Sequence, residues 1–123
     1  MDFQNKKAIY LQIADYICEQ ILLKKWSSNE KIPSVRDMAV QLAVNPNTIM
    51  RSYEFLESNN IITMQRGIGY FVANHAYAQV VALKKEEFLK TDLPQIFRSM
   101  KLLNITLNDL QHLYELRKSH ETK

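Results

Sequence analysis

The 123-residue sequence predicts a mainly α-helical fold with one small β-hairpin. Three observations lead to this prediction. Apolar residues recur at helical spacing in three successive segments of the first half of the chain. Two short β-prone runs, residues 61–64 and 70–72, then flank a turn that holds both glycines of the sequence. A further helical pattern occupies most of residues 76–123. The chain is long enough for one domain, or for a compact domain with a short appendage.

Composition limits the function classes that need to be considered. Hydrophobic residues make up 46% and charged residues 24%, as in a globular protein with an apolar core. No apolar run approaches the roughly 20 residues that span a bilayer, and residues 1–7 lack the apolar stretch of a signal peptide. We therefore expect a cytoplasmic protein without a membrane partner. The net charge of +3 is compatible with a polyanionic partner, but 16 basic against 13 acidic residues do not decide the matter.

The first predicted helix covers residues 8–23 and packs through one apolar stripe. The residues at helical spacing on this stripe are Ile9, Ile13, Tyr16, Ile17 and Ile21. The segment also contains Cys18, the only cysteine, which excludes an intrachain disulfide and a cysteine-based zinc site. We interpret Cys18 as a small residue on a packing helix.

The second predicted helix begins after Ser34, a residue type that caps helix N-termini, with Asp37 at the position of a capping-box partner. Pro33 keeps the preceding chain extended. Arg36 points outward from the first turn. The residues expected on the buried side are Val35, Met38, Ala39 and Leu42.

The third predicted helix begins at Pro46, because Asn45 is a favoured N-cap and proline is best tolerated at the first helical position. One face should be core and consists of Ile49, Ser52, Tyr53 and Leu56. The other face carries Asn47, Met50, Arg51 and Glu54, with Thr48 in the first turn. Short polar side chains and an arginine at a helix N-terminus suit phosphate and base-edge contacts in DNA.

The second and third helices form a helix-turn-helix, and the hairpin that follows strengthens a DNA-binding interpretation. Gly67 and Gly69 lie in the hairpin turn, where positive φ or a close approach of backbone to a ligand favours glycine. Arg66 at the tip can enter a minor groove or contact a phosphate. A hairpin with an exposed arginine and no ligand is the simpler alternative.

Other chemistries find less support in the sequence. The three histidines, His75, His112 and His120, have no suitably spaced catalytic partners, so we expect no enzymatic activity and no cofactor. Asp109 and His112 could supply two metal ligands, but solvated side chains are far commoner at such positions, and we predict no metal site. A winged-helix protein-interaction or RNA-binding module remains the alternative to a DNA-binding protein.

Three blocks of the sequence, taken together, resemble the winged helix-turn-helix domain of the GntR family over roughly residues 8–73. The blocks are "IYLQIADYICEQI", "IPSVRDMAVQLAVNPNTIMRSYEFLESNNII" and "RGIGYFV". The resemblance implies DNA contacts from Ser34, Arg36, Asn45, Asn47, Thr48, Arg51, Arg66, Gly67 and Gly69. The family usually has a glycine between the first helix and the "PS" motif, whereas "KKWSSNEK" has none.

We divide the chain into a winged helix-turn-helix domain, residues 1–74, and a helical tail, residues 75–123. A tail this short is similar to that of the YtrA-type subfamily, since larger GntR regulators have much longer effector domains. Pro94 should kink the tail or restart it after Asp92, and "TLND" from Thr106 to Asp109 has capping-box form. The apolar residues expected to form a dimer interface are Phe88, Leu89, Leu93, Ile96, Phe97, Met100 and Leu103.

The sequence therefore predicts a sequence-specific transcriptional regulator that binds double-stranded DNA as a homodimer. A repressor is favoured, because domains of this kind often occlude promoters. Two recognition helices related by a two-fold axis would read an inverted repeat. The sequence gives neither the operator nor the effector.

Overall fold

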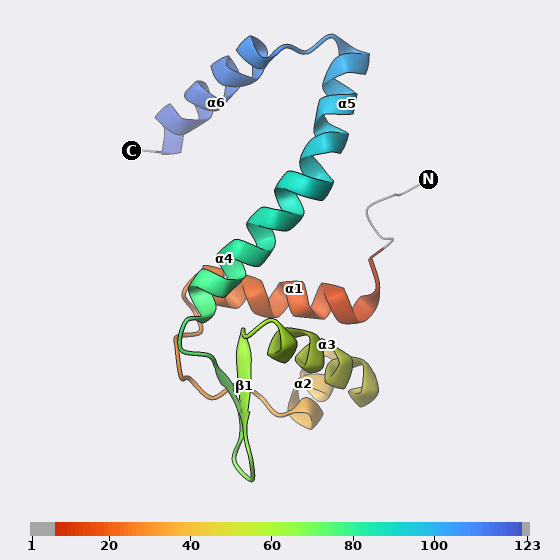
Figure 1. Cartoon of the computed structure of the whole chain (residues 1–123), viewed down its shortest axis with the longest axis vertical. Helices are drawn as coiled ribbons and strands as arrows, with labels where there is room; N and C mark the ends of the chain where they lie inside the picture. Colours follow the sequence, from red (N-terminus) through yellow and green to blue (C-terminus); the bar gives the residue numbers. More distant parts are fainter. Residues whose placement is uncertain (1–6, 122–123) are drawn as a thin grey trace. The chain divides into compact units, whose positions relative to one another are not determined.

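The structure is a computed structural model that describes residues 7–121 (Figure 1). The elements in chain order are α1 (Ile9–Leu22), α2 (Val35–Leu42), α3 (Pro46–Ser58), β1 (Ile62–Gln65), β2 (Gly69–Val72), α4 (Ala76–Glu87), the π-helical segment η2 (Phe88–Asp92), α5 (Leu93–Leu103) and α6 (Leu107–Glu121). The only sheet among the described residues is the antiparallel pair β1–β2. The predicted fold class, mainly helical with one small hairpin, is confirmed.

The chain divides into two compact units, one ending at Leu83 and the other beginning at Lys84. The first unit extends beyond the hairpin because Ala76 and Val80 of α4 are buried in its core. We expected a boundary after residue 74, which lies just past the hairpin. The first turns of α4 also belong to the first unit, so the division falls later, after Leu83.

The core of the first unit lies between α1, α2, α3 and the base of the hairpin. The predicted inner face of α3 is confirmed: Ile49, Ser52, Tyr53 and Leu56 are all buried. On α2, Met38 and Ala39 are buried, while Val35 and Leu42 are partly buried against the core.

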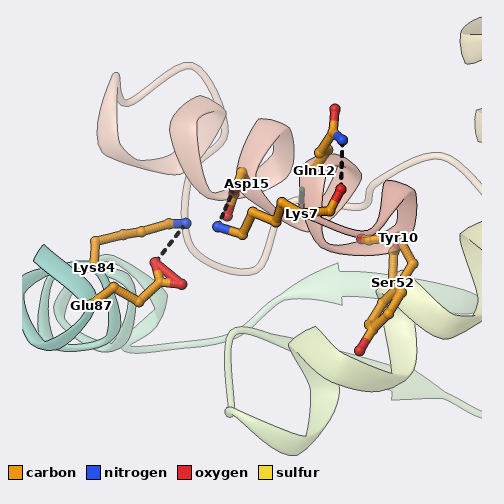
Figure 2. Close-up of polar contacts among 7 residues, drawn as sticks. All are labelled: Lys7, Tyr10, Gln12, Asp15, Ser52, Lys84 and Glu87. Carbon is orange, nitrogen blue, oxygen red and sulfur yellow. Dashed lines mark hydrogen bonds and ion pairs between the residues drawn. The ribbon is translucent and has the colours of Figure 1, made fainter. Parts of the chain in front are cut away.

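The predicted stripe of α1 is wrong at two positions. Ile9 is 57% exposed and Tyr16 is 42% exposed, whereas Ala14 and Cys18 are buried beside Ile13, Ile17 and Ile21. The buried face of α1 is therefore rotated, relative to the predicted stripe, toward Ala14 and Cys18. Small side chains on this face allow α1 to approach α3 closely, and Ser52 Oγ of α3 donates a hydrogen bond to the Tyr10 carbonyl oxygen at 2.7 Å (Figure 2).

Side-chain caps fix the two helices of the helix-turn-helix. Ser34 Oγ accepts a hydrogen bond from the Asp37 N–H at 3.1 Å, and Asn45 Oδ1 accepts one from the Asn47 N–H at 2.8 Å. Pro46 opens α3, as the sequence predicts. Between the helices Ala43 takes the left-handed conformation, with φ of 55°, and its N–H bonds to carbonyls in the last turn of α2. The turn is thus made without glycine.

The connection between α1 and α2 also lacks glycine, and asparagine supplies one of its left-handed residues. Asn29 has φ of 68°, a conformation that asparagine tolerates better than most residues. Its N–H donates to the Val72 carbonyl at 2.8 Å, and the Ile32 N–H donates to the Tyr70 carbonyl at 3.0 Å. Residues 29–32 thereby line the outer edge of β2 and tie the hairpin to the segment that enters α2.

The helix of the second unit changes its hydrogen-bonding pattern just before Pro94. The sequence predicts a break in the regular helix there but does not predict the π-helical turn that forms it. The Leu93 N–H bonds to the Phe88 carbonyl, which gives the wider turn of a π-helix directly before the proline. The wider turn makes room for the proline ring, so the chain changes its hydrogen-bonding pattern and stays helical.

The predicted capping box of the last helix is confirmed. The Thr106 N–H donates to Asp109 Oδ2 at 2.9 Å, and the Asp109 N–H donates to Thr106 Oγ1 at 3.1 Å. The bond from the Thr106 backbone, together with one from its side chain, lowers the pKa of Asp109. The carboxylate of Asp109 therefore serves as a helix cap.

Replacing Ala43 by glycine should stabilise the protein. The left-handed conformation costs a residue with a side chain about 1–2 kcal/mol, and the greater freedom of glycine in the unfolded chain offsets about 0.4–1 kcal/mol of the gain. Urea denaturation should show a net increase of about 0.5–1 kcal/mol in the free energy of unfolding. The matched control is Ala82→Gly in α4, which should lower that free energy by about 0.5–1 kcal/mol. Equal destabilisation by both variants would contradict the assigned conformation of the turn.

Candidate nucleic-acid interface

The N-terminal ends of α2 and α3 present five of the predicted DNA-contacting residues. Ser34, Arg36, Asn45 and Asn47 are exposed, and Thr48 is half-buried in the first turn of α3. In both caps the side-chain oxygen accepts a hydrogen bond. The Ser34 hydroxyl hydrogen and the Asn45 side-chain NH₂ group are donors that the caps do not use, so they can bond to a ligand. The helix-turn-helix thus ends in polar groups that can bond to phosphates and base edges.

The charge along α3 favours its N-terminal end as the side for a polyanion. From Pro46 to Tyr53 the helix carries one arginine and no acid. The acids Glu54 and Glu57 follow in its second half, where they add to burial in raising the pKa of Tyr70 on β2. Because the positive end of the helix dipole also lies at the N-terminus, a phosphate is attracted there and repelled from the other end.

Arg66 and Gly67 occupy the tip of the hairpin and are exposed, and the Ile68 N–H closes the turn onto the Gln65 carbonyl at 2.9 Å. Gly67 has φ of 77° with open space where a Cβ would lie. Gly69 has φ of 138°, and a Cβ there would meet the Lys31 side chain at 3.2 Å from Cε. The two glycines therefore serve different purposes: Gly67 permits the turn, and Gly69 also makes room for Lys31.

Lys31 is a cation beside the hairpin that the sequence did not single out. It bridges Phe71 of β2 in antiparallel fashion, and its exposed side chain passes close to Gly69. No sequence pattern marks residues 29–32 as a strand, because their pairing with β2 depends on the tertiary fold. The hairpin region accordingly carries two basic side chains, Arg66 and Lys31.

Tyr53 connects the parts that carry these residues. Its hydroxyl donates a hydrogen bond to the Pro33 carbonyl at 2.7 Å, at the entry to α2, and its ring meets Tyr70 of β2 edge-on, with centroids 4.8 Å apart. Burial raises the pKa of Tyr53, and nearby Tyr70 and Asp37 add to the effect, so the hydroxyl stays protonated as a donor. One buried side chain thus fixes α3, the start of α2 and the hairpin relative to one another.

The predicted DNA-contacting residues fall into two groups on the first unit. One group lies at the starts of α2 and α3 and the other on the hairpin, and Figure 1 shows α2, α3 and the hairpin on the same side of α1. Arg51 lies further along α3, with its guanidinium over the Tyr10 ring of α1. Tyr10 is a second residue that the sequence analysis did not single out for the site.

A helix-turn-helix with a polar, positively polarised recognition helix, followed by a β-hairpin tied to it, defines the winged-helix class of DNA-binding domains. Residues 9–72 match the sequence model of the bacterial regulatory proteins of the gntR family. The chain belongs to the GntR family, and it is a transcriptional regulator with a GntR-type DNA-binding domain.

Two relatives from Bacillus subtilis match over most of their length. The chain is 40% identical over 108 residues to the uncharacterized HTH-type transcriptional regulator YhcF, covering 88% of each chain. It is 30% identical over 110 residues to the HTH-type transcriptional repressor YtrA, covering 89% of this chain and 84% of YtrA. The expected resemblance to the YtrA-type subfamily is confirmed. These relatives and the family are regulators, which confirms the prediction that the chain is not an enzyme.

Solved structures agree with this family assignment. A GntR-family regulator from Bacteroides thetaiotaomicron has a TM-score of 0.79 at 44% identity, covering 93% of this chain and 99% of that chain. The DNA-binding domain of AraR in complex with operator ORR3 has a TM-score of 0.50 at 30% identity, covering 52% of this chain and 77% of that chain. Within residues 7–121, no helix combines the length and apolar character needed to cross a membrane.

Gly69→Val should weaken DNA binding with only a modest loss of stability. The new side chain would meet Lys31 and force a β-branched residue into a backbone conformation that it rarely adopts, and this strain is local to the exposed end of the hairpin. Affinity for duplex DNA should fall about fivefold, for a cost of about 1 kcal/mol. The midpoint of thermal unfolding should fall by about 4–8 °C at most.

The control for this variant is Thr63→Val, which adds a β-branched apolar residue at an exposed position of β1 in regular strand geometry. It should leave affinity unchanged. Wild-type affinity in Gly69→Val would show that the hairpin does not take part in binding.

Proposed function

We propose that the chain is a homodimeric repressor that binds an inverted-repeat operator through the helix-turn-helix and the hairpin of each protomer. The contacts proposed for each protomer come from Ser34, Arg36, Asn45, Asn47, Thr48, Arg51, Arg66, Gly67 and Gly69. The observation that carries the DNA-contacting part is the cluster of polar groups at the N-terminal ends of α2 and α3. Four of the five residues that carry these groups are exposed and Thr48 is half-buried, and all five lie at the positive N-terminal ends of α2 and α3. Because bacterial DNA is cytoplasmic, we propose that location as well.

The second unit supports the dimer. It comprises residues 84–123, and units of about 40 residues usually need a partner or a cross-link for stability. Its helices expose large apolar side chains: Phe97 is 50% exposed, Leu103 67%, Leu107 69% and Tyr114 66%. Apolar surface of this extent, on a unit too small to bury it, is typical of an interface between chains.

The seven predicted interface residues differ in how far one chain already buries them. Phe88, Leu89, Ile96, Phe97 and Leu103 are exposed, and Leu93 is half-buried. Met100 is 8% exposed and lines an open surface pocket of about 440 Å³ with Ile96, Ile105 and Leu110. We therefore place Met100 beneath the proposed interface, where a substitution would disturb the tail itself.

Two comparisons support repression at an operator. The relative YtrA is described as a transcriptional repressor, and the AraR domain was solved with operator DNA. A two-fold dimer would place two recognition helices about one helical turn, roughly 34 Å, apart along the duplex. A protein seated across a promoter in this way excludes other proteins from it.

Selection of bound fragments from the genomic DNA of the parent organism tests the proposal directly. The enriched fragments should share an inverted repeat. Asn47→Ala should then lower affinity for the selected site by about 1–3 kcal/mol and relax the preference at one position of each half-site, as expected for a base contact. Tighter binding to RNA of the selected sequence, or enrichment of no sequence, would contradict the proposal.

Charged replacements on the tail should separate the protomers. Phe97→Glu combined with Leu103→Glu introduces charge at two exposed interface positions, so light scattering should report a folded monomer. Operator affinity should fall at least about a hundredfold, because the two recognition helices are no longer linked and binding at one half-site no longer favours binding at the other. The matched control is Leu102→Glu, which changes a 74% exposed leucine outside the predicted stripe and should leave the dimer intact. A double variant that remains dimeric with full affinity would contradict the assigned interface.

A further inference from the structure

Arg51 on the recognition helix stacks on an aromatic ring from another helix. The guanidinium carbon of Arg51 lies 4.1 Å from the centroid of the Tyr10 ring in the first turns of α1. Arg51 is exposed, and Tyr10 is half-buried. An arginine that stacks on an aromatic face keeps its N–H groups in the plane of the guanidinium, where they can still bond to an anion at its edge.

The backbone that carries the Tyr10 ring is held in place. Ser52 Oγ, on the residue next to Arg51, donates to the Tyr10 carbonyl at 2.7 Å. The first turn of α1 is further fixed by Gln12, whose side-chain nitrogen donates to the Lys7 carbonyl at 2.8 Å (Figure 2). The Lys7 ammonium also lies 2.6 Å from the Asp15 carboxylate (Figure 2). The backbone of Tyr10 is therefore fixed, and its ring supports the long side chain of Arg51.

Arg51 has no acidic partner among residues 7–121. The ion pairs recorded within residues 7–121 join other residues, and none of them includes Arg51. A structural arginine normally ends on a carboxylate or on carbonyl oxygens, which accept its donors. Here the guanidinium lies over a π face, and none of its N–H donors has an acceptor among residues 7–121.

We propose that Tyr10 is a positioning residue that orients Arg51 to bind a phosphate of the DNA backbone. The inference rests on the proposed function, in which α3 is the recognition helix. The contact with Tyr10 holds the guanidinium beside α1, and Arg51 itself lies past the first turn of α3, where base edges would be read. It also restricts a long side chain before binding, so less conformational freedom is lost when the phosphate is engaged. Arg51 therefore contributes affinity that does not depend on base sequence.

The experiment uses the full chain and a 30-base-pair duplex of random sequence, since a phosphate contact needs no operator. Affinity is measured over a range of salt concentrations for the wild type, Tyr10→Leu, Tyr10→Phe, Arg51→Ala and the double variant Tyr10→Leu/Arg51→Ala. Arg51→Ala should lower affinity and make the slope of log affinity against log salt shallower by about 0.9 for each protomer bound.

Tyr10→Leu should lower affinity about two- to fivefold for each protomer bound, the range expected from losing one exposed cation–π contact. In the Arg51→Ala background the same change should have no further effect. Tyr10→Phe retains the aromatic face and should bind like the wild type. If Tyr10 acted only through packing, Tyr10→Leu would lower affinity in the Arg51→Ala background as well. Wild-type affinity in Tyr10→Phe together with no effect of Tyr10→Leu in that background therefore indicates a role through Arg51.

Two results would overturn the inference: equal losses from Tyr10→Leu with and without Arg51, or a loss in Tyr10→Phe as large as in Tyr10→Leu. Thermal unfolding of each variant identifies any loss that arises from the fold, and Tyr10→Phe provides the test if Tyr10→Leu does not fold. Failure of the wild-type chain to bind any duplex would instead contradict the proposed function, so the two outcomes are distinguishable.

Discussion

The arrangement of the DNA-binding unit depends on the burial of Tyr53. Its hydroxyl bonds to the Pro33 carbonyl, and its ring meets Tyr70 of the hairpin. A buried tyrosine must satisfy its hydroxyl, and a single good acceptor lies at the entry to α2. The position of the recognition helix, the start of the helix before it and the direction of the hairpin are therefore set by one side chain. Ser52, the residue before it, attaches the same helix to α1 through the Tyr10 carbonyl.

Local signals predicted the helices of the first unit and most of the surface residues. Serine and asparagine caps, proline at a first helical position and Gly67 in the hairpin turn are each decided within a few residues of chain, and all appear in the structure. Gly69, which the sequence placed in the same turn, is instead the first residue of β2 and pairs with Gln65. Features that depend on residues distant in sequence were not predicted. These include the exposure of Ile9 and Tyr16, the edge that residues 29–32 add to β2, and the stack of Arg51 on Tyr10.

The tail illustrates a different limit of sequence reasoning. Periodicity identified its apolar residues, but it does not say which of them one chain can bury by itself. Met100 is buried within the described chain, while Phe97 and Leu103 at similar spacing are exposed. The π-helical turn before Pro94 could not be predicted from the sequence pattern either. A kink, a restart of the helix and a π-helical turn can each accommodate a proline at the same position.

The two edges of the hairpin differ in a way that bears on solubility. Residues 29–32 bond to β2 along its outer side, so that edge offers few free backbone groups to another chain. The outer edge of β1 has no strand beside it within the described residues, and it is only four residues long. Short edges are one means by which proteins avoid strand-to-strand aggregation. A hairpin can thus extend far enough from its domain to reach a ligand while offering neighbouring molecules too little exposed strand to propagate a sheet.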